Sequence, residues 1–326
     1  MHGIGYSNDV AGGFAQYMPL AERLLLEVPN GLPAAHAALT EPIAVGWHAV
    51  QKARLTPDDV PLVIGCGPVG LAVIASPKIS GVHPIIAADF SSKRRSLAVE
   101  MGADIVVDPG EMSPYMSWHQ AATPAGYDGS RYAQLFGFSP KLPPAVIFEC
   151  VGVPGVIQQV IDGAPAGARV VIVGVCMQTD QFEPFFGVVK QLKLQFVLGY
   201  TGEEFAASLN HIAEGRIAVT PLITGHVGLG GVKGAFAELA NPEQHAKSDG
   251  RAVVVGDARY WAPSSPRADH VGLLSTSSAF IEGRSRDGAA PTAAIRRVAD
   301  NEGHGIIRQN RGVGKPARSP RGSGLV

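Results

Sequence analysis

The chain has 326 residues, of which 46% are hydrophobic and 17% charged, and its formal net charge is -1. These values describe a soluble globular protein of about two domains and exclude a general electrostatic attraction to nucleic acid. No basic segment followed by an apolar one opens the sequence, and no apolar run is long enough to cross a bilayer. We therefore expect a cytoplasmic protein with neither a membrane nor a nucleic-acid partner.

The three cysteines, Cys66, Cys150 and Cys176, each lie in or beside an apolar run. Their odd number and wide spacing indicate buried thiols in a reducing compartment rather than disulfides. The sequence has no Cys-x-x-Cys pair of the kind that holds a structural zinc.

The first thirty residues are rich in glycine and predict short strands at 12–18 and 23–28. Two or three strands cannot form a core of their own, so this segment is expected to be part of a larger β-rich domain. Residues 33–52 predict a helix with a boundary or kink just before Pro42.

From Val60 the pattern changes to alternating strands and helices. Six apolar runs predict strands at about 61–65, 84–89, 104–107, 144–149, 168–174 and 193–199. The clearest helices between them are predicted after Gly67, at 92–101 and at 155–162. The runs are nearly continuous in apolar character, as parallel strands covered on both faces are. The sequence therefore predicts an α/β fold, a doubly wound six-stranded parallel sheet that binds its ligand at the carboxyl ends of its strands.

The other stretches are less regular. Residues 108–143 are rich in turn residues, with a helix expected near 130–136. Beyond the sixth strand the pattern predicts a helix at 201–215, a strand at 217–223, a helix at 232–239 and a last strand at 252–255. After about residue 257, Pro, Ser, Gly and Arg dominate, and we expect disorder.

The first strand of the alternating region runs into Gly65-Cys66-Gly67-Pro68-Val69-Gly70 and then into a helix. This is the pattern of a phosphate-binding turn in a dinucleotide-binding unit. Gly65 allows the tight turn, Gly67 lets the backbone approach a pyrophosphate, and Gly70 lets the helix pack closely on the strand. The residues whose backbone N–H groups are expected to bind the pyrophosphate are Gly65, Gly67, Val69 and Gly70. The alternative is an ordinary glycine-rich loop between a strand and a helix.

An acid closes the second strand of this region. Asp89 follows Gly70 at about the interval at which a carboxylate accepts the ribose hydroxyls of NAD, and it repels the 2′-phosphate of NADP. The sequence therefore favours NAD as the cofactor over NADP. Lys93, Arg94 and Arg95 follow, and they would attract such a phosphate or form a solvated helix face. Arg94 is the one expected to lie along the adenine.

The fourth and fifth strands end across the sheet from this turn. Val151 and Gly152 follow the fourth strand, and Val173 and Gly174 end the fifth. Because an open parallel sheet binds its ligand at this edge, we expect these four residues to line the nicotinamide end of the cofactor. Cys150 is not expected to act as a nucleophile.

Eight short motifs follow one another between residues 11 and 247. They are GGFAQY at 12–17, EPIAVGWHA at 41–49, GCGPVG at 65–70, MGAD at 101–104, FECVG at 148–152, GEEF at 202–205, PLIT at 221–224 and AF at 235–236. As a set they resemble the medium-chain, zinc-type alcohol dehydrogenases, nearest the branch of the threonine and sorbitol dehydrogenases.

The resemblance implies an oxidoreductase that transfers a hydride between NAD(P) and a small alcohol, aldehyde or ketone, with a homo-oligomer as a further expectation. It also implies a zinc ion that polarises the substrate oxygen as a Lewis acid. Glu41 matches the acidic residue that these enzymes place at or beside the zinc, and its alternative is a helix-end carboxylate. His48 is a candidate for a proton relay, and its alternative is a packed or capping histidine.

The chain departs from the family pattern at both ends. The other zinc ligands, a Cys and a His-Glu pair, precede the family position at which Met1 stands, so we expect an N-terminally truncated form without most zinc ligands. After Lys247 the sequence resembles no part of the family, which indicates an unrelated C-terminal tail. Three hypotheses follow: a zinc-type dehydrogenase, active or inactive as this chain; a zinc-free enzyme of the quinone-reductase type; and a non-catalytic NAD-binding remnant.

The resemblance also implies a division into domains. Residues 1–50 are expected to be part of a GroES-like catalytic domain, 51–201 a Rossmann dinucleotide-binding domain, 202–257 a return to the catalytic domain, and 258–326 a disordered tail.

Overall fold

A computed structural model of the chain describes residues 12–14, 21–125, 142–235, 252–255, 298–299 and 305–306. The strands are β1 (Val60–Ile64), β2 (Ile86–Ala88), β3 (Ile105–Val107), β4 (Ala145–Glu149), β5 (Arg169–Ile172), β6 (Lys193–Phe196), β7 (Ile223–Val227), β8 (Ala252–Val255), β9 (Val298–Ala299) and β10 (Gly305–Ile306). The α-helices are α1 (Ala34–Ala37), α2 (Thr40–Ala53), α3 (Pro68–Ile79), α4 (Ser92–Met101), α5 (Pro114–Ala122), α7 (Val156–Gly163), α8 (Pro184–Val189) and α9 (Gly202–Ala213). Short 3-10 turns are η1 (Glu22–Leu24), η2 (Pro29–Gly31), η3 (Thr220–Leu222) and η4 (Leu229–Gly231).

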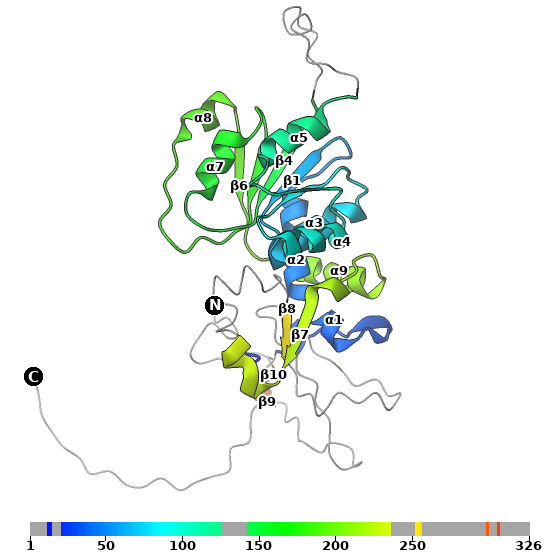
Figure 1. Ribbon diagram of the computed structural model, residues 1–326. Coiled ribbons are helices and arrows are strands. Elements are labelled where there is room, and N and C mark those ends of the chain that lie inside the picture. The colour runs from blue at the N-terminus through cyan, green and yellow to red at the C-terminus, as the bar shows by residue number, and fades with distance from the viewer. Residues whose placement is uncertain are drawn as a thin grey trace, which may run out of the picture.

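Within the described residues, β1 to β6 form one sheet in the order β3-β2-β1-β4-β5-β6. Every pair in it is parallel. The chain moves outward from β1 to β3 and then crosses back to β4, so β1 and β4 are the neighbours at which the strand order reverses (Figure 1). The predicted α/β fold with six parallel strands is confirmed, and such a sheet binds ligands outside the carboxyl ends of the strands at this reversal.

Helices cover both faces of the sheet. Alternate residues of one strand face opposite sides, so Val63 of β1 packs with α2, α3 and α4 while its neighbour Leu62 packs with α5 and α7. Both side chains are fully buried. Burial of a side chain of this size stabilises the fold by about 1.5–3 kcal/mol, so the two layers fix the plane of the sheet and the positions of its strand ends.

Helix α2 joins the sheet to the rest of the chain by packing against α3 and α9. A side chain at Gly46 would bring a Cβ within 2.5 Å of the backbone of Ala72 in α3, so only glycine allows this approach. The predicted boundary before Pro42 is present, because α1 ends at Ala37 and α2 begins at Thr40.

The structure differs from the prediction at four elements. Residues 23–28 form a 3-10 turn and extended chain instead of a strand, and no described strand pairs with them. The strand expected at 217–223 begins only at Ile223, because the 3-10 turn η3, with Pro221 in it, precedes it. Helices α5 and α8 were not predicted, since each begins with a proline that reads as a turn residue but is tolerated in the first helical turn.

Several predictions lie outside the described residues. They are the end of the strand at 12–18, the helix at 130–136, the end of the helix at 232–239 and nearly all of the expected disordered tail at 258–326. The last strand, at 252–255, is β8, which pairs in parallel with β7 away from the six-stranded sheet (Figure 1). In the described part of the chain, no helix is both long and apolar enough to span a bilayer.

Candidate functional site

The turn between β1 and α3 requires glycine at two positions for steric reasons. Gly65 has a φ of +91°, and a Cβ there would lie 2.7 Å from Cγ2 of Val151. A Cβ on Gly70 would lie 1.8 Å from the carbonyl oxygen of Gly65, so α3 could not pack on the end of β1. The Gly65 N–H donates to the carbonyl of Ala88 at 2.8 Å, which joins the turn to the end of β2.

Gly67 differs from its neighbours because nothing lies within 4 Å of the position that its Cβ would take. It is the N-cap residue of α3, and Pro68, which has no N–H, takes the first helical position. The N–H groups of Val69 and Gly70 in the first turn have no acceptor within the helix. An open backbone surface beside a helix N-terminus fits the size and charge of a pyrophosphate.

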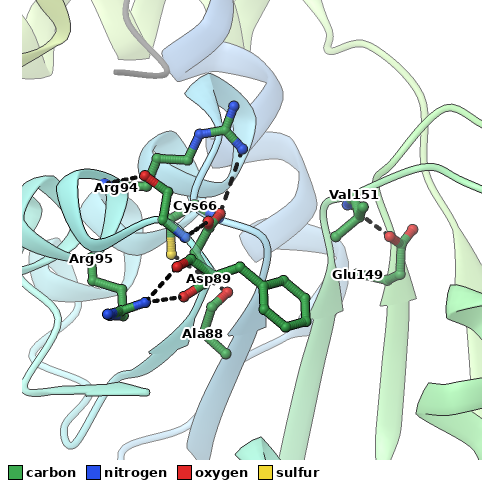
Figure 2. Close-up of polar contacts among 9 residues, drawn as sticks. Cys66, Ala88, Asp89, Arg94, Arg95, Glu149 and Val151 are labelled. Carbon is green, nitrogen blue, oxygen red and sulfur yellow. Dashed lines mark hydrogen bonds and ion pairs between the residues drawn. The ribbon is translucent and has the colours of Figure 1, made fainter. Parts of the chain in front are cut away.

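Asp89 fixes the turn from the end of β2 (Figure 2). Its Oδ2 accepts the Cys66 N–H at 2.8 Å, and its Oδ1 accepts the Ser91 N–H at 2.8 Å. The residue is 8% exposed. An ionised carboxylate has about four acceptor positions, so these two bonds leave room for two hydroxyls of a ribose.

The two arginines of α4 have different surroundings. Arg95 bridges Asp108 and the carbonyl oxygens of Asp89 and Phe90, each at 2.8 Å, so its guanidinium is fixed within the loop. Arg94 makes a longer ion pair, with its Nη1 3.6 Å from Oδ2 of Asp89 (Figure 2). Of these two arginines, Arg94 therefore has the less tightly fixed guanidinium. Phe90, which directly follows Asp89, is 74% exposed.

The ends of β4 and β5 meet across the sheet from Asp89. The carbonyl of Glu149 accepts the N–H groups of Val173 and Gly174, both at 2.9 Å. A Cβ on Gly174 would lie 2.3 Å from the Gly152 nitrogen, so the two loops are in direct contact. Val151 is 43% exposed, whereas Val173 is buried in the core. Of the four residues predicted here, Val151, Gly152 and Gly174 lie at the edge, and the Val173 side chain faces inward.

The sequence did not indicate the role of Glu149, the last residue of β4. Its Oε1 accepts the N–H groups of Val151 and Gly152, at 2.7 and 2.9 Å, and the side chain is almost fully buried. A carboxylate at the end of an apolar strand, directly before the predicted loop, was the available signal.

The thiols near the turn are not reactive groups. Cys66, Cys150 and Cys176 are all free, but of these thiols, all predicted to be buried, only Cys66 is buried and the other two are partly exposed. Burial, assisted by the charge of Asp89, raises the pKa of the Cys66 thiol, and burial raises the pKa of the Cys150 thiol as well. Both therefore stay protonated at neutral pH and are poor nucleophiles.

Glu41 and His48 both lie on α2 but have separate partners. Burial raises the pKa of the Glu41 carboxyl, while a hydrogen bond with Tyr200 opposes the rise. The Nδ1 of His48 lies 2.8 Å from Oε2 of Glu204, which also accepts the Thr201 N–H at the start of α9. His48 thus joins α2 to the capping box of α9. This arrangement corresponds to the packed or capping histidine that was the alternative to a proton relay.

In the part of the chain that the structure describes, no metal cluster is found, and the cavities lie away from the glycine turn. Within the described ranges, no three His, Cys, Asp or Glu side chains lie close enough together to hold a metal ion. One cavity of about 810 Å³ lies between α7 and α8, and another of about 740 Å³ lies at the amino ends of β4 and β5. No predicted site residue lines either of them.

Comparison with known proteins gives consistent matches. Residues 68–214 match the family model of the zinc-binding dehydrogenases. (R,R)-butanediol dehydrogenase of Bacillus subtilis (strain 168) is 32% identical over 213 residues, which are 65% of this chain and 56% of that protein. The crystal structure of 2R,3R-butanediol dehydrogenase from Bacillus subtilis has a TM-score of 0.57 at 30% identity and covers 72% of this chain and 62% of that chain. A candidate zinc-binding dehydrogenase from Sinorhizobium meliloti 1021, bound to NADP, has a TM-score of 0.57 at 25% identity, covering 71% and 63%.

An open parallel sheet in this strand order, with a glycine turn at the reversal and an acid after the second strand, defines a dinucleotide-binding α/β domain. The matches agree with this class over the residues that they cover, 68–214 for the family model. Over the part of the chain that they cover, the matches support the zinc-type medium-chain alcohol dehydrogenases as its family. It spans little more than half the length of the curated relatives that it matches.

Proposed function

We propose that the chain binds a nicotinamide adenine dinucleotide, NAD in preference to NADP, and transfers a hydride between it and a small alcohol or the corresponding carbonyl compound. The observation that carries this proposal is the hydrogen bond between the glycine turn and Asp89, in which the Cys66 N–H donates to the carboxylate at 2.8 Å. This bond holds an acceptor for the ribose hydroxyls beside the helix N-terminus that binds the pyrophosphate.

Each part of the cofactor has its own group of residues in this proposal. The residues for the pyrophosphate are Gly67, Val69 and Gly70. The N–H of Gly65, also predicted for this role, donates to the Ala88 carbonyl instead, so Gly65 shapes the turn. The residues for the adenosine are Asp89 and Arg94, and those for the nicotinamide end are Val151, Gly152 and Gly174. The bound nicotinamide ring supplies the hydride acceptor. The exposed part of Val151 offers that ring an apolar wall, which disfavours water beside the reacting carbon.

The family implies a zinc ion, and Glu41 is the residue at a family zinc position. A carboxylate must be deprotonated to bind a metal, and the raised pKa of Glu41 opposes this. Among the described residues, no group of three His, Cys, Asp or Glu side chains forms around it. In the part of the chain that the structure describes, the donor set does not fit a catalytic zinc, which needs about three protein ligands.

The substrate class follows from the relatives rather than from a substrate pocket. Since relatives of this chain are butanediol dehydrogenases, small vicinal diols are the first substrates to test. The purified full chain is incubated with NAD and a panel of diols and polyols, with and without added zinc, and NADH is followed by its absorbance. Formation of NADH with a diol supports the proposal. Failure to bind NADH in a fluorescence titration would overturn it.

Binding without turnover is the second candidate function. The observation that favours it is that His48, the residue considered for a proton relay, is held by Glu204 in a helix-capping arrangement. Saturable NADH binding with no NADH formation over the whole panel, also with zinc, would select this candidate.

We also propose that a second copy of the chain covers the edge at β6. Among the described strands, β6 is the last of the sheet. Exposed apolar side chains lie on α8, on β6 and just after β6: Phe185, Val188, Phe196 and Leu198 are 65%, 73%, 65% and 82% exposed. An unpaired strand edge beside an apolar surface favours association with another strand. Pairing of two such edges around a two-fold axis gives a homodimer.

A further inference from the structure

Glu149 is a buried acid whose position none of the roles above explains. It is the last residue of β4, next to the strand reversal, and its register partners are Ile64 of β1 and Ile172 of β5. The residue is 1% exposed. Burial of a carboxylate is costly unless hydrogen bonds compensate for the lost water, so its partners show what it stabilises.

The carboxylate of Glu149 acts on the loop that follows it. Its Oε1 accepts the Val151 N–H at 2.7 Å (Figure 2). The same oxygen accepts the next N–H along the chain, that of Gly152, at 2.9 Å. Gly152 has a φ of +68°, a conformation that favours glycine. The two bonds therefore hold the loop in one backbone conformation, and bonds to an ionised acceptor are about twice as strong as neutral ones.

The same loop is confined from two other sides. Cγ2 of Val151 lies 2.7 Å from the position that a Cβ of Gly65 would take, so the loop touches the glycine turn. On the side of β5, a Cβ on Gly174 would lie 2.7 Å from Oε2 of Glu149. The carboxylate is thus enclosed between the loops after β4 and β5, and it sets how far Val151 projects from the edge of the sheet.

We infer that Glu149 is a positioning residue for the nicotinamide half of the cofactor, acting through the backbone of Val151 and Gly152. The inference rests on the proposed function, because it requires that the cofactor binds at this edge. Glu149 itself does not touch the cofactor. Its removal weakens the contacts of the nicotinamide and leaves those of the adenosine and pyrophosphate, which belong to β1, α3 and β2.

The contacts of the two halves of the cofactor can be measured separately with two ligands, NADH and ADP-ribose. ADP-ribose contains the adenosine, pyrophosphate and second ribose of NADH but lacks the nicotinamide, so the ratio of their affinities reports the nicotinamide contacts alone. The full chain and its Glu149→Met variant are titrated with both ligands by calorimetry. Met has a similar size but no strong acceptor, and we expect the ratio to fall about tenfold, the equivalent of one hydrogen bond to a charged group. Glu149→Gln keeps an acceptor oxygen and restores the ratio to within about twofold of the original.

The matched control is Asp59→Asn, which alters another buried acid at the opposite end of β1. Asp59 accepts the Thr56 N–H and pairs with Arg169, far from the proposed cofactor edge. We expect this variant to lower the unfolding temperature without changing the affinity ratio. Should Glu149→Met fail to fold, Glu149→Asp replaces it, because its carboxylate is withdrawn by one methylene but stays buried and charged.

The inference is overturned if Glu149→Met keeps the wild-type ratio, if Glu149→Gln loses as much as Glu149→Met, or if Asp59→Asn lowers the ratio equally. A wild-type chain that binds neither ligand overturns the proposed function instead, and the inference with it. The two failures are therefore distinguished by the wild-type titration alone.

Discussion

Two alanine substitutions three residues apart in the glycine turn are expected to have different effects: one destabilises the fold, and the other weakens cofactor binding. At Gly70 the new Cβ would lie 1.8 Å from the carbonyl oxygen of Gly65. The oxygen belongs to the backbone, and the position of the Cβ is fixed by the backbone of α3, so α3 must move away from the end of β1. Overpacking of this kind costs about 3 kcal/mol, or about 10 °C in unfolding temperature for a domain of this size.

At Gly67 the same methyl group meets nothing within 4 Å, and the φ of -71° suits alanine. Gly67→Ala is therefore expected to leave the free energy of unfolding within about 0.5 kcal/mol of the original value. The methyl group occupies the space proposed for the pyrophosphate, so NADH affinity falls at least about tenfold, or about 1.4 kcal/mol.

Thermal unfolding by circular dichroism and NADH titration by fluorescence, on both variants and the parent chain, test the pair. Gly67→Ala serves as the control for Gly70→Ala, because the two changes are chemically identical. Equal stability of Gly70→Ala and the parent would contradict the packing argument. Unchanged NADH binding by a stable Gly67→Ala variant would refute the assignment of this turn to the pyrophosphate.

Three further predictions concern other parts of the chain. Asp89→Asn removes the charge that repels a 2′-phosphate, so the affinity for NADPH relative to that for NADH should rise about tenfold in paired titrations. An unchanged affinity ratio would contradict the role of Asp89. Burial opposes ionisation of Glu204, but the Thr201 N–H and His48 lower its pKa below 4.5 in the fold. The stabilisation by ionised Glu204 is thus present above pH 4.5 and is lost as the pH falls through the folded pKa. The unfolding temperature of Glu204→Gln should therefore fall less than that of the parent between pH 6 and pH 3.5. Equal falls would count against the pairing of Glu204 with His48. Phe196→Lys at the β6 edge should convert a dimer into a monomer in light scattering, and a monomeric parent chain would contradict the proposed interface.

The segments of the six strands were predictable because parallel strands covered on both faces are nearly continuous in apolar character, which makes them clear in the sequence. The positions of α3 and α4 were also clear, since each follows a recognisable start, Pro68 in one and Ser91 in the other. Helix α5 was missed because Pro114 was counted among the turn residues of 108–143, and no helix was predicted where α8 begins at Pro184. The segment 23–28 was interpreted as a strand from its apolar residues, although a strand also needs a neighbour that local sequence does not specify.

The site could be predicted only in part for a related reason. Gly65, Gly70 and Asp89 have steric or electrostatic roles that their spacing reveals, and the structure brings these residues together. Arg94 and Arg95 differ because Arg95 pairs with Asp108, which lies beyond the next strand. No local sequence pattern indicates this pair. Likewise, the partner of His48 is 156 residues away in sequence. The assigned cofactor roles and the domain boundaries at residues 50, 201 and 257 stay predictions.

The central claim is that the edge formed by the glycine turn, Asp89 and the loop after β4 binds a nicotinamide dinucleotide. Isothermal titration calorimetry of NADH into the purified full chain tests this most directly, with Gly67→Ala as the comparison. The account predicts saturable binding at one site per chain that is weakened at least about tenfold in the variant. An absence of binding to the folded parent chain, or binding of equal strength by both proteins, would contradict it.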